Sequence, residues 1–224
     1  MVTQPPALDI AGLRFRYPGA DADTVQLDAL SLGQGEQALL TGASGTGKST
    51  LLQLIAGLMR PAAGTISIAG EDIHAMADAK RDLFRGAKVG MIFQTFNLLQ
   101  GFSAAENVMM AMMFSDVPRK EHRSRAVDLL RQVGIDTPAR EVTQLSVGQQ
   151  QRVAVARAAA ASPIIVLADE PTASLDPDAA AAAMDLIQET CRSIGAALLC
   201  TSHDPSMAER FDRREALVPA GAGG

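Results

Sequence analysis

Four short apolar runs, each followed at once by glycine or polar residues, predict strands that are buried on both faces. They are residues 39–41 before Gly42, 89–93 before Gln94, 164–168 before Asp169-Glu170, and 196–201 before Ser202-His203. Apolar runs without alternation are typical of parallel strands that are covered on both sides. In an open parallel α/β sheet, ligands bind just beyond the carboxyl ends of the strands. The pattern therefore predicts an α/β fold with a mainly parallel sheet, and one edge at which these polar residues meet.

Between these runs, apolar periodicity predicts helices and further strands. Residues 8–41 are typical of β-structure with turns, and residues 65–69 of one more strand. Helices are expected at 49–59, at 119–133 with a basic start, from 147 to about 161, and from Pro177 after an Asp176 N-cap. The methionine-rich residues 107–114 are typical of helix core, with an adaptable docking surface as the alternative.

A glycine-rich loop, GASGTGKST, follows the first apolar run and opens a helix at Lys48. Its glycines let successive backbone N–H groups turn toward an anion, and the helix adds unpaired N–H groups and the positive end of its dipole. Lys48 suits the β- and γ-phosphates, and the Ser49 hydroxyl suits Mg²⁺. The alternative is an ordinary glycine-rich turn, which would leave the other polar strand ends unexplained.

Two carboxylates directly after a buried strand are costly unless they have a function or a solvated cleft. Beside Lys48 and Ser49, Asp169 suits a Mg²⁺ ligand. Glu170 would point the other way and could deprotonate an attacking water. Ser146 and Gln149 form a capping box at a second helix start, which is a second candidate anion site or simply a well-capped helix. Asp176 likewise has a local role as N-cap that needs no ligand.

Composition excludes several classes of protein. The net charge of −5 argues against a nucleic-acid partner that needs a basic footprint. Cys191 and Cys200 lack metal-ligand spacing and are expected to be free thiols in a reducing compartment. No run approaches the roughly 18 apolar residues that cross a bilayer, and the first residues do not resemble a signal peptide. We expect a soluble chain without direct membrane insertion, whose membrane role comes through a partner.

Taken together, these motifs resemble the ATP-binding subunits of ABC transporters over nearly the whole chain. GASGTGKST matches the family's Walker A motif, IIVLADE its Walker B strand and LSVGQQQR its signature sequence. Gln94 is similar to the Q-loop glutamine, Asp176 lies in a D-loop-like SLD, His203 matches the switch histidine, and Tyr17 the aromatic residue that stacks on adenine. The segment IFQTFNLLQGFSAAENV and the short C-terminus look most like the lipoprotein-releasing and macrolide-export branch. Val147 departs from the glycine that is commonest in the signature.

The resemblance implies a P-loop NTPase core with a mainly parallel sheet, an N-terminal antiparallel β subdomain and a helical subdomain. Within a single domain of residues 1–224, it implies a core at about 8–94 and 162–217, a helical subdomain at about 95–161 that carries the signature, and a disordered tail at 218–224.

It also implies a Mg²⁺-dependent ATPase in which two copies pack head to tail around ATP. The expected nucleotide contacts are Tyr17, Gly42, Ala43, Ser44, Gly45, Thr46, Gly47, Lys48, Ser49 and Thr50 of one copy, completed by Ser146, Gly148, Gln149 and Asp176. The expected metal ligands are Ser49, Gln94 and Asp169, and the residues expected at the reaction itself are Lys48, Gln94, Glu170 as general base, and His203.

The implied partners are a second copy and transmembrane permease subunits, which are expected to dock on residues 95–115. The implied location is the cytoplasm, peripheral on the cytoplasmic face of the inner membrane. The alternative is an ABC-type ATPase that regulates a membrane protein without transport, as cell-division relatives do. A soluble P-loop protein, such as a repair ATPase or a small-molecule kinase, is a weaker alternative.

Overall fold

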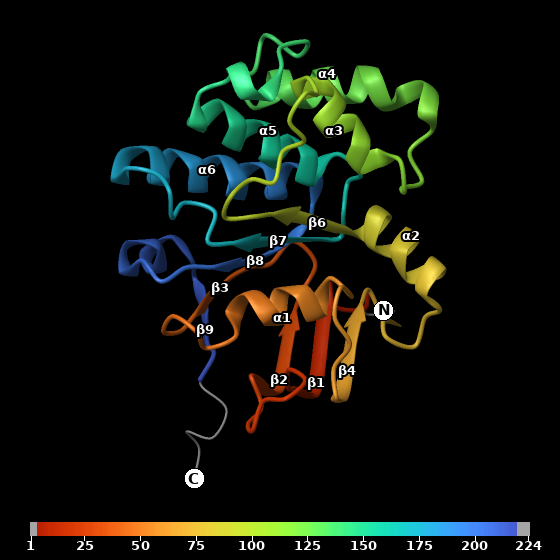
Figure 1. The fold of residues 1–224 in the computed structure, drawn as a ribbon, viewed down its shortest axis with the longest axis vertical. Coiled ribbons are helices and arrows are strands. Elements are labelled where there is room, and N and C mark those ends of the chain that lie inside the picture. The colour runs from red at the N-terminus through yellow and green to blue at the C-terminus, as the bar shows by residue number, and fades with distance from the viewer. Residues whose placement is uncertain (1–3, 219–224) are drawn as a thin grey trace.

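The computed structural model describes residues 4–218 and arranges them in layers (Figure 1). The central sheet has the strand order β6-β7-β8-β3-β9, and every neighbouring pair in it is parallel. Its strands are β3 (Gln37–Thr41), β6 (Val89–Ile92), β7 (Ile165–Asp169), β8 (Ala197–Thr201) and β9 (Arg213–Ala216). The four predicted apolar runs are therefore strands of one sheet, and their carboxyl ends share one edge.

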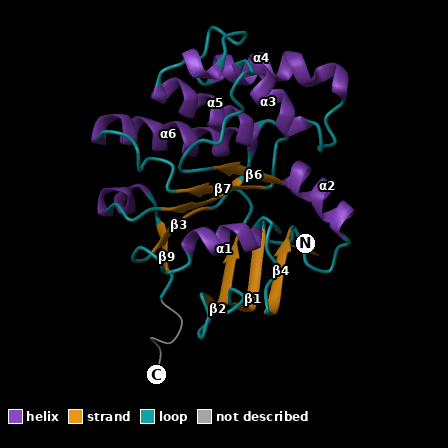
Figure 2. Ribbon diagram, in the orientation of Figure 1, coloured by secondary structure: helices purple, strands orange, loops and turns teal. Residues whose placement is uncertain are grey.

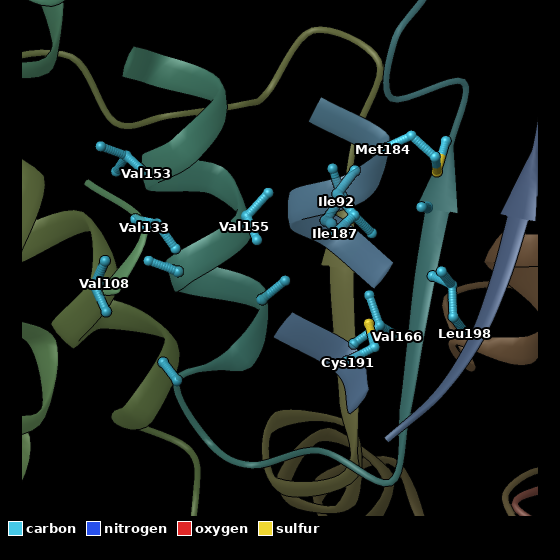
Figure 3. Packing of buried hydrophobic residues seen from close by; sticks show 14 of the residues in the cluster. Ile92, Val108, Val133, Val153, Val155, Val166, Met184, Ile187, Cys191 and Leu198 are labelled. Carbon is cyan, nitrogen blue, oxygen red and sulfur yellow. The ribbon is translucent and has the colours of Figure 1, made fainter. Parts of the chain in front are cut away.

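Alternate residues of the central strands pack on opposite faces of the sheet, and both faces are covered. Val166 and Leu198 point toward the layer that contains α6 (Pro177–Ile194) and α5 (Val147–Ala159), as Figure 3 shows. Leu167 and Leu199 pack on the other face, in the cluster that includes α1 (Lys48–Ile55). Burial on both sides explains why these strands read as uninterrupted apolar runs.

A second, antiparallel sheet lies beyond α1 (Figure 1). It has the order β2-β1-β4-β5 and consists of β1 (Leu8–Phe15), β2 (Val25–Leu32), β4 (Ala63–Ile68) and β5 (Glu71–Asp72). Its apolar side chains join those of α1 in one cluster. This sheet packs against the glycine-rich loop, because Val25 at the start of β2 lies next to Gly47.

The remaining helices lie on the α6 side of the central sheet or beside it (Figure 2). They are α2 (Asp78–Lys88), α3 (Ala104–Met112) and α4 (His122–Gln132), with short 3₁₀ turns at Arg119–Glu121, Val142–Gln144 and Pro205–Arg210. Helices α3, α4 and α5 pack against one another through Val108, Leu130 and Val153. Cys191 and Cys200 are free and buried, and burial raises the pKa of the Cys191 thiol to about 12.

Several expectations need correction at element boundaries. The helix expected over 49–59 ends at Ile55, because the chain turns at Gly57, whose φ is 67°. The helix expected over 119–133 begins as a 3₁₀ turn and becomes an α-helix only at His122. The methionine-rich stretch is divided, since Met112 is fully buried whereas Met110 and Met113 are exposed. The tail expected to be disordered lies outside the described residues except for Val218.

Candidate nucleotide site

The glycine-rich loop joins β3 to α1 and places the start of α1 at the carboxyl edge of the central sheet. Gly47 has a φ of 90°, and a Cβ there would lie 2.6 Å from the Thr24 carbonyl oxygen, so only glycine fits. No side chain caps the N-terminus of α1, as is also true of α2 and α4, whereas Ser103, Ser146 and Asp176 cap α3, α5 and α6. The first N–H groups of α1 are thus left for an anion.

Lys48 lies folded into this loop and is 7% exposed. Its Nζ donates hydrogen bonds to the carbonyl oxygens of Gly42, at 2.8 Å, and Ala43, at 3.2 Å. The same Nζ lies 3.8 Å from Glu170 Oε1. On the far side, Glu170 Oε2 is 2.6 Å from Nδ1 of His203. A cation, a carboxylate and an imidazole that come from three strand ends are therefore in direct contact.

Asp169 points toward α1 and meets two hydroxyl groups. Ser49 Oγ donates to Asp169 Oδ1 at 3.0 Å, and Thr201 Oγ1 is 2.9 Å from the same oxygen. The hydroxyl of the loop and the carboxylate of β7, which are the two protein ligands expected for Mg²⁺, are thus already adjacent. Hydroxyl and carboxylate oxygens are ligands that a hard divalent cation prefers.

Lys48, Ser49, Glu170 and His203 line a hollow of about 330 Å³, and Asp169 lies beside it through its contact with Ser49. Its lining includes most of the loop, from Ser44 to Thr50, together with Gln94, Glu170 and His203. Tyr17 lies next to the same helix start, and its hydroxyl is 3.1 Å from Thr50 Oγ1. Phe15 meets the Tyr17 ring edge to face, with 4.9 Å between the ring centroids, which orients the ring. The structure therefore brings together Tyr17, the glycine-rich loop, Gln94, Asp169, Glu170 and His203.

The second predicted anion site is not part of this hollow. Ser146 and Gln149 form the expected capping box at the start of α5, with both hydrogen bonds present. This helix belongs to the layer on the α6 side of the central sheet, whereas α1 lies on the other side (Figure 1). Val147 is 53% exposed, and nothing lies within 4 Å of where a Cβ on Gly148 would be. Asp176 caps α6 through the Ala179 N–H and does not line the hollow described above. One chain thus presents two anion-suited helix starts that do not meet.

Comparisons with known proteins identify the family. The family profile described as ABC transporter matches residues 26–173. The chain belongs to the ABC transporter family. It is 43% identical over 217 residues to the lipoprotein-releasing system ATP-binding protein LolD of Anaeromyxobacter dehalogenans, covering 95% of this chain and 91% of that protein. It is 42% identical to LolD 1 of Caulobacter vibrioides, covering 94% and 92%.

Solved structures of ABC cassettes have the same fold. A dimeric structure of the ATP-binding cassette MJ0796 in a post-hydrolysis state, bound to ADP and Pi, superimposes with a TM-score of 0.82 at 31% identity and covers 94% of each chain. CbiO1 of Clostridium perfringens, part of the transporter complex cbiONQ, has a TM-score of 0.83 at 26% identity and covers 96% of this chain and 85% of that one. These comparisons confirm the predicted family, the predicted fold and the prediction of an ATPase subunit that works with a transporter.

Two contributors to the site were missed from the sequence. Thr201 is expected only as part of a buried strand, because its contact with Asp169 exists only once β7 and β8 pair. Arg157 of α5 was also missed. Its guanidinium donates to the carbonyl oxygens of Phe96 and Asn97, both at 2.6 Å, just after Gln94. Among the helices of the described part of the chain, none combines the length and apolarity that a bilayer crossing requires.

Proposed function

We propose that this chain is the ATP-hydrolysing subunit of a transporter of the lipoprotein-releasing type, and that it works as a head-to-tail dimer. The observation that carries the proposal is the convergence of four strand ends on one hollow. A phosphate cradle at the end of β3, Gln94 after β6, two carboxylates at the end of β7 and a histidine after β8 together meet the requirements of phosphoanhydride hydrolysis. The names of the most similar relatives favour lipoproteins as the transported substrate.

ATP is proposed to lie with its base on Tyr17 and its phosphates in the loop from Gly42 to Thr50. The Lys48 ammonium, now bonded to loop carbonyls, would turn to the β- and γ-phosphates. The backbone N–H groups of the loop and of the uncapped α1 start would hold the remaining phosphate oxygens. The backbone donors are proposed to be held by the fold before ATP arrives, so their contribution is electrostatic and needs little reorganisation. Only the Lys48 side chain has to turn.

The donor set fits Mg²⁺ as the metal that accompanies ATP. Ser49 and Asp169 would hold it, with Gln94 as the third protein ligand. Mg²⁺ that accompanies a nucleotide binds largely through phosphate oxygens and water, so few protein ligands are needed. When bound, Mg²⁺ neutralises charge on the phosphates.

Glu170 is proposed as the general base and His203 as the group beside it that contacts the γ-phosphate. Glu170 lies between Lys48 and His203 at the hollow, and the attacking water is proposed to lie against its carboxylate. His203 would hold the carboxylate, the water and the phosphate in line.

The signature helix start is proposed to act on the ATP of a second copy. Ser146 and Gly148 are exposed at the start of α5 but lie across the sheet from their own chain's loop, so they can reach a γ-phosphate only in another chain. Gln149 and Asp176 are proposed to lie at the same dimer interface. Closure around two ATP molecules and reopening after hydrolysis would then move the membrane subunits.

Those permease subunits are proposed to dock on residues 95–115, within the helical subdomain at about 95–161. The rest of the chain, about 8–94 and 162–217, would form the catalytic core and its β subdomain. The subunit would be peripheral, on the cytoplasmic face of the inner membrane.

The test is Glu170→Gln, which keeps the shape of the side chain but removes the base. We expect ATP hydrolysis to fall by at least about a hundredfold, because general bases contribute on the order of 10²–10⁴-fold. ATP should still bind, and size-exclusion chromatography should then show a long-lived ATP-dependent dimer. Glu189→Gln, on the exposed side of α6, is the matched control and should hydrolyse ATP at the wild-type rate. Wild-type turnover in Glu170→Gln would refute the role of Glu170.

A further inference from the structure

Thr201 is a fully buried polar residue that contacts Asp169, the last residue of β7, and Glu170, which follows it. It is the last residue of β8 and has an exposed fraction of 0%. Its Oγ1 lies 2.9 Å from Asp169 Oδ1 and 3.0 Å from the backbone nitrogen of Glu170. The parallel register pairs Asp169 with Thr201 directly, so the contact follows from the strand pairing and not from a flexible loop.

The direction of these two hydrogen bonds is fixed by chemistry. An ionised carboxylate can only accept, so the single Thr201 hydroxyl hydrogen is donated to Asp169. The Glu170 N–H can only donate, so it donates to the hydroxyl oxygen of Thr201. One hydroxyl therefore holds the side chain of one residue and the backbone of the next.

The backbone of Glu170 needs such a restraint. Its φ is 45°, in the left-handed region that non-glycine residues rarely adopt. That conformation persists only where neighbouring groups hold it, and it directs the Glu170 side chain toward Lys48 and His203. Without the Thr201 hydroxyl, the Glu170 N–H would lose its partner and Asp169 Oδ1 would keep only the hydrogen bond from Ser49.

We propose that Thr201 is a positioning residue whose hydroxyl fixes the orientation of two carboxylates, the proposed metal ligand Asp169 and the proposed general base Glu170. The inference rests on the proposed function, because it assigns Thr201 its effect through Asp169 and Glu170. Thr201 itself is not expected to touch ATP. Its hydroxyl keeps Asp169 turned toward Ser49 and keeps Glu170 in its left-handed conformation. One hydroxyl thus supports both metal binding by Asp169 and proton removal by Glu170.

The experiment compares Thr201→Val, which has the same shape without the hydroxyl, with Thr201→Ser, which keeps the hydroxyl. Thr41→Val is the matched control, since Thr41 ends the neighbouring strand β3 and its hydroxyl donates to the Glu215 carbonyl at 3.1 Å, away from the carboxylates. The measurements are kcat and KM for ATP, the Mg²⁺ concentration for half-maximal activity, the Mn²⁺ affinity of the nucleotide complex by EPR, ATP binding in EDTA, and the melting temperature.

For Thr201→Val we expect kcat to fall and the Mn²⁺ affinity to weaken, each by about 10–100-fold, the usual effect of removing a hydrogen-bond partner of a metal ligand. ATP binding in EDTA should stay within about twofold of wild type, because the phosphate cradle does not involve Thr201. Thr201→Ser should recover most of both losses. Thr41→Val should lower neither kcat nor Mn²⁺ affinity.

Two results with a folded Thr201→Val protein would overturn the proposal. One is a Thr201→Val protein with wild-type kcat and Mn²⁺ affinity. The other is equal losses in Thr201→Val and Thr41→Val that follow the melting temperature, which would mean general damage to the sheet edge. If Thr201→Val does not fold, a Thr201→Ser protein that is folded but as impaired as Glu170→Gln would also refute it. Failure of the proposed function would look different, because Glu170→Gln would then hydrolyse ATP at the wild-type rate. In that case the Mn²⁺ affinity would still test whether Thr201 orients Asp169.

Discussion

At the scale of single residues, the site stores strain where its chemistry is expected. Glu170 has a positive φ although it is not glycine, and Lys48 is buried among carbonyl oxygens and one carboxylate. A left-handed conformation costs an ordinary residue about 1–2 kcal/mol. The Glu170 N–H donates to Thr201 Oγ1, and the Glu170 carboxylate accepts from His203. These hydrogen bonds offset that cost and keep the carboxylate in place. The left-handed backbone of Glu170 thus lowers the stability of the fold but orients the proposed base.

A prediction follows from comparing Glu170→Gly with Glu170→Ala. Both variants remove the carboxylate and should lose hydrolysis, but only glycine relieves the left-handed backbone. We expect Glu170→Gly to be about 1 kcal/mol more stable than Glu170→Ala, measured as the free energy of unfolding by urea denaturation. At a position with ordinary strand conformation, glycine makes the protein less stable than alanine does. A more stable glycine variant at position 170 would therefore be a specific sign of the left-handed backbone. Equal stabilities would show that residue 170 is not strained.

At the scale of elements, strand ends and helix caps are the features that the sequence predicts well. A buried parallel strand appears in the sequence as a short apolar run, and a helix cap appears as residue types at fixed spacing. Both can therefore be recognised from a few consecutive residues. The capping box of Ser146 and Gln149 and the N-cap at Asp176 are present as predicted. Helix α2 was not predicted, because most of its residues are charged or small and its leucine, Leu83, is exposed, so no apolar run marks it. It is supported instead by charge pairs such as that between Asp78 and Arg81.

The loop after Gln94 depends on contacts that no local pattern reveals. Phe96 and Asn97 have φ values of 57° and 49°, and both carbonyl oxygens accept from Arg157, which lies sixty residues later in α5. Burial lowers the pKa of Arg157, and its guanidinium lies 6.0 Å from the centre of the Phe93 ring. Thr201 and Arg157 were missed for the same reason, since their roles exist only once distant segments are adjacent.

The two roles of Asp176 can be separated at this scale. Its carboxylate accepts from the Ala179 N–H at 3.0 Å and so caps α6. Asp176→Ala should lower the free energy of unfolding by about 1 kcal/mol, whereas Asp176→Ser should restore the cap. If Asp176 also acts across the proposed dimer, the serine variant will be stable but impaired in ATP-dependent dimerisation, measured by size-exclusion chromatography with a Glu170→Gln background. Full recovery of both properties by serine would assign Asp176 a local role only.

At the scale of the whole molecule, the central sheet separates two kinds of surface. The face with α1 and the antiparallel sheet carries the glycine-rich loop, and the face with α3, α4, α5 and α6 carries the signature motif (Figure 1). Residues in the helical layer also leave large apolar side chains uncovered. Phe102, Met110, Met113 and Phe114, which we name the α3 patch, are 42%, 39%, 48% and 60% exposed. Adjacent apolar side chains of this size on a surface mark an interaction site, and methionine adapts to the shape of its partner.

The α3 patch gives the last prediction, which concerns coupling rather than chemistry. Arg157 contacts the loop after Gln94 and also lines a groove with Met110 and Phe114, so a partner on this groove would lie beside the loop that follows Gln94.

Met113→Ser combined with Phe114→Ser should abolish co-purification with the permease subunits, because the apolar contact area is lost. The ATPase activity of the isolated subunit should stay within about twofold of wild type, since no residue of the nucleotide hollow changes. Leu58→Ser, at a 51% exposed leucine just after α1, is the matched control and should leave co-purification intact. A double variant that still binds the permease would place the docking surface elsewhere, and one that loses activity alone would mean that the patch supports the fold of the site.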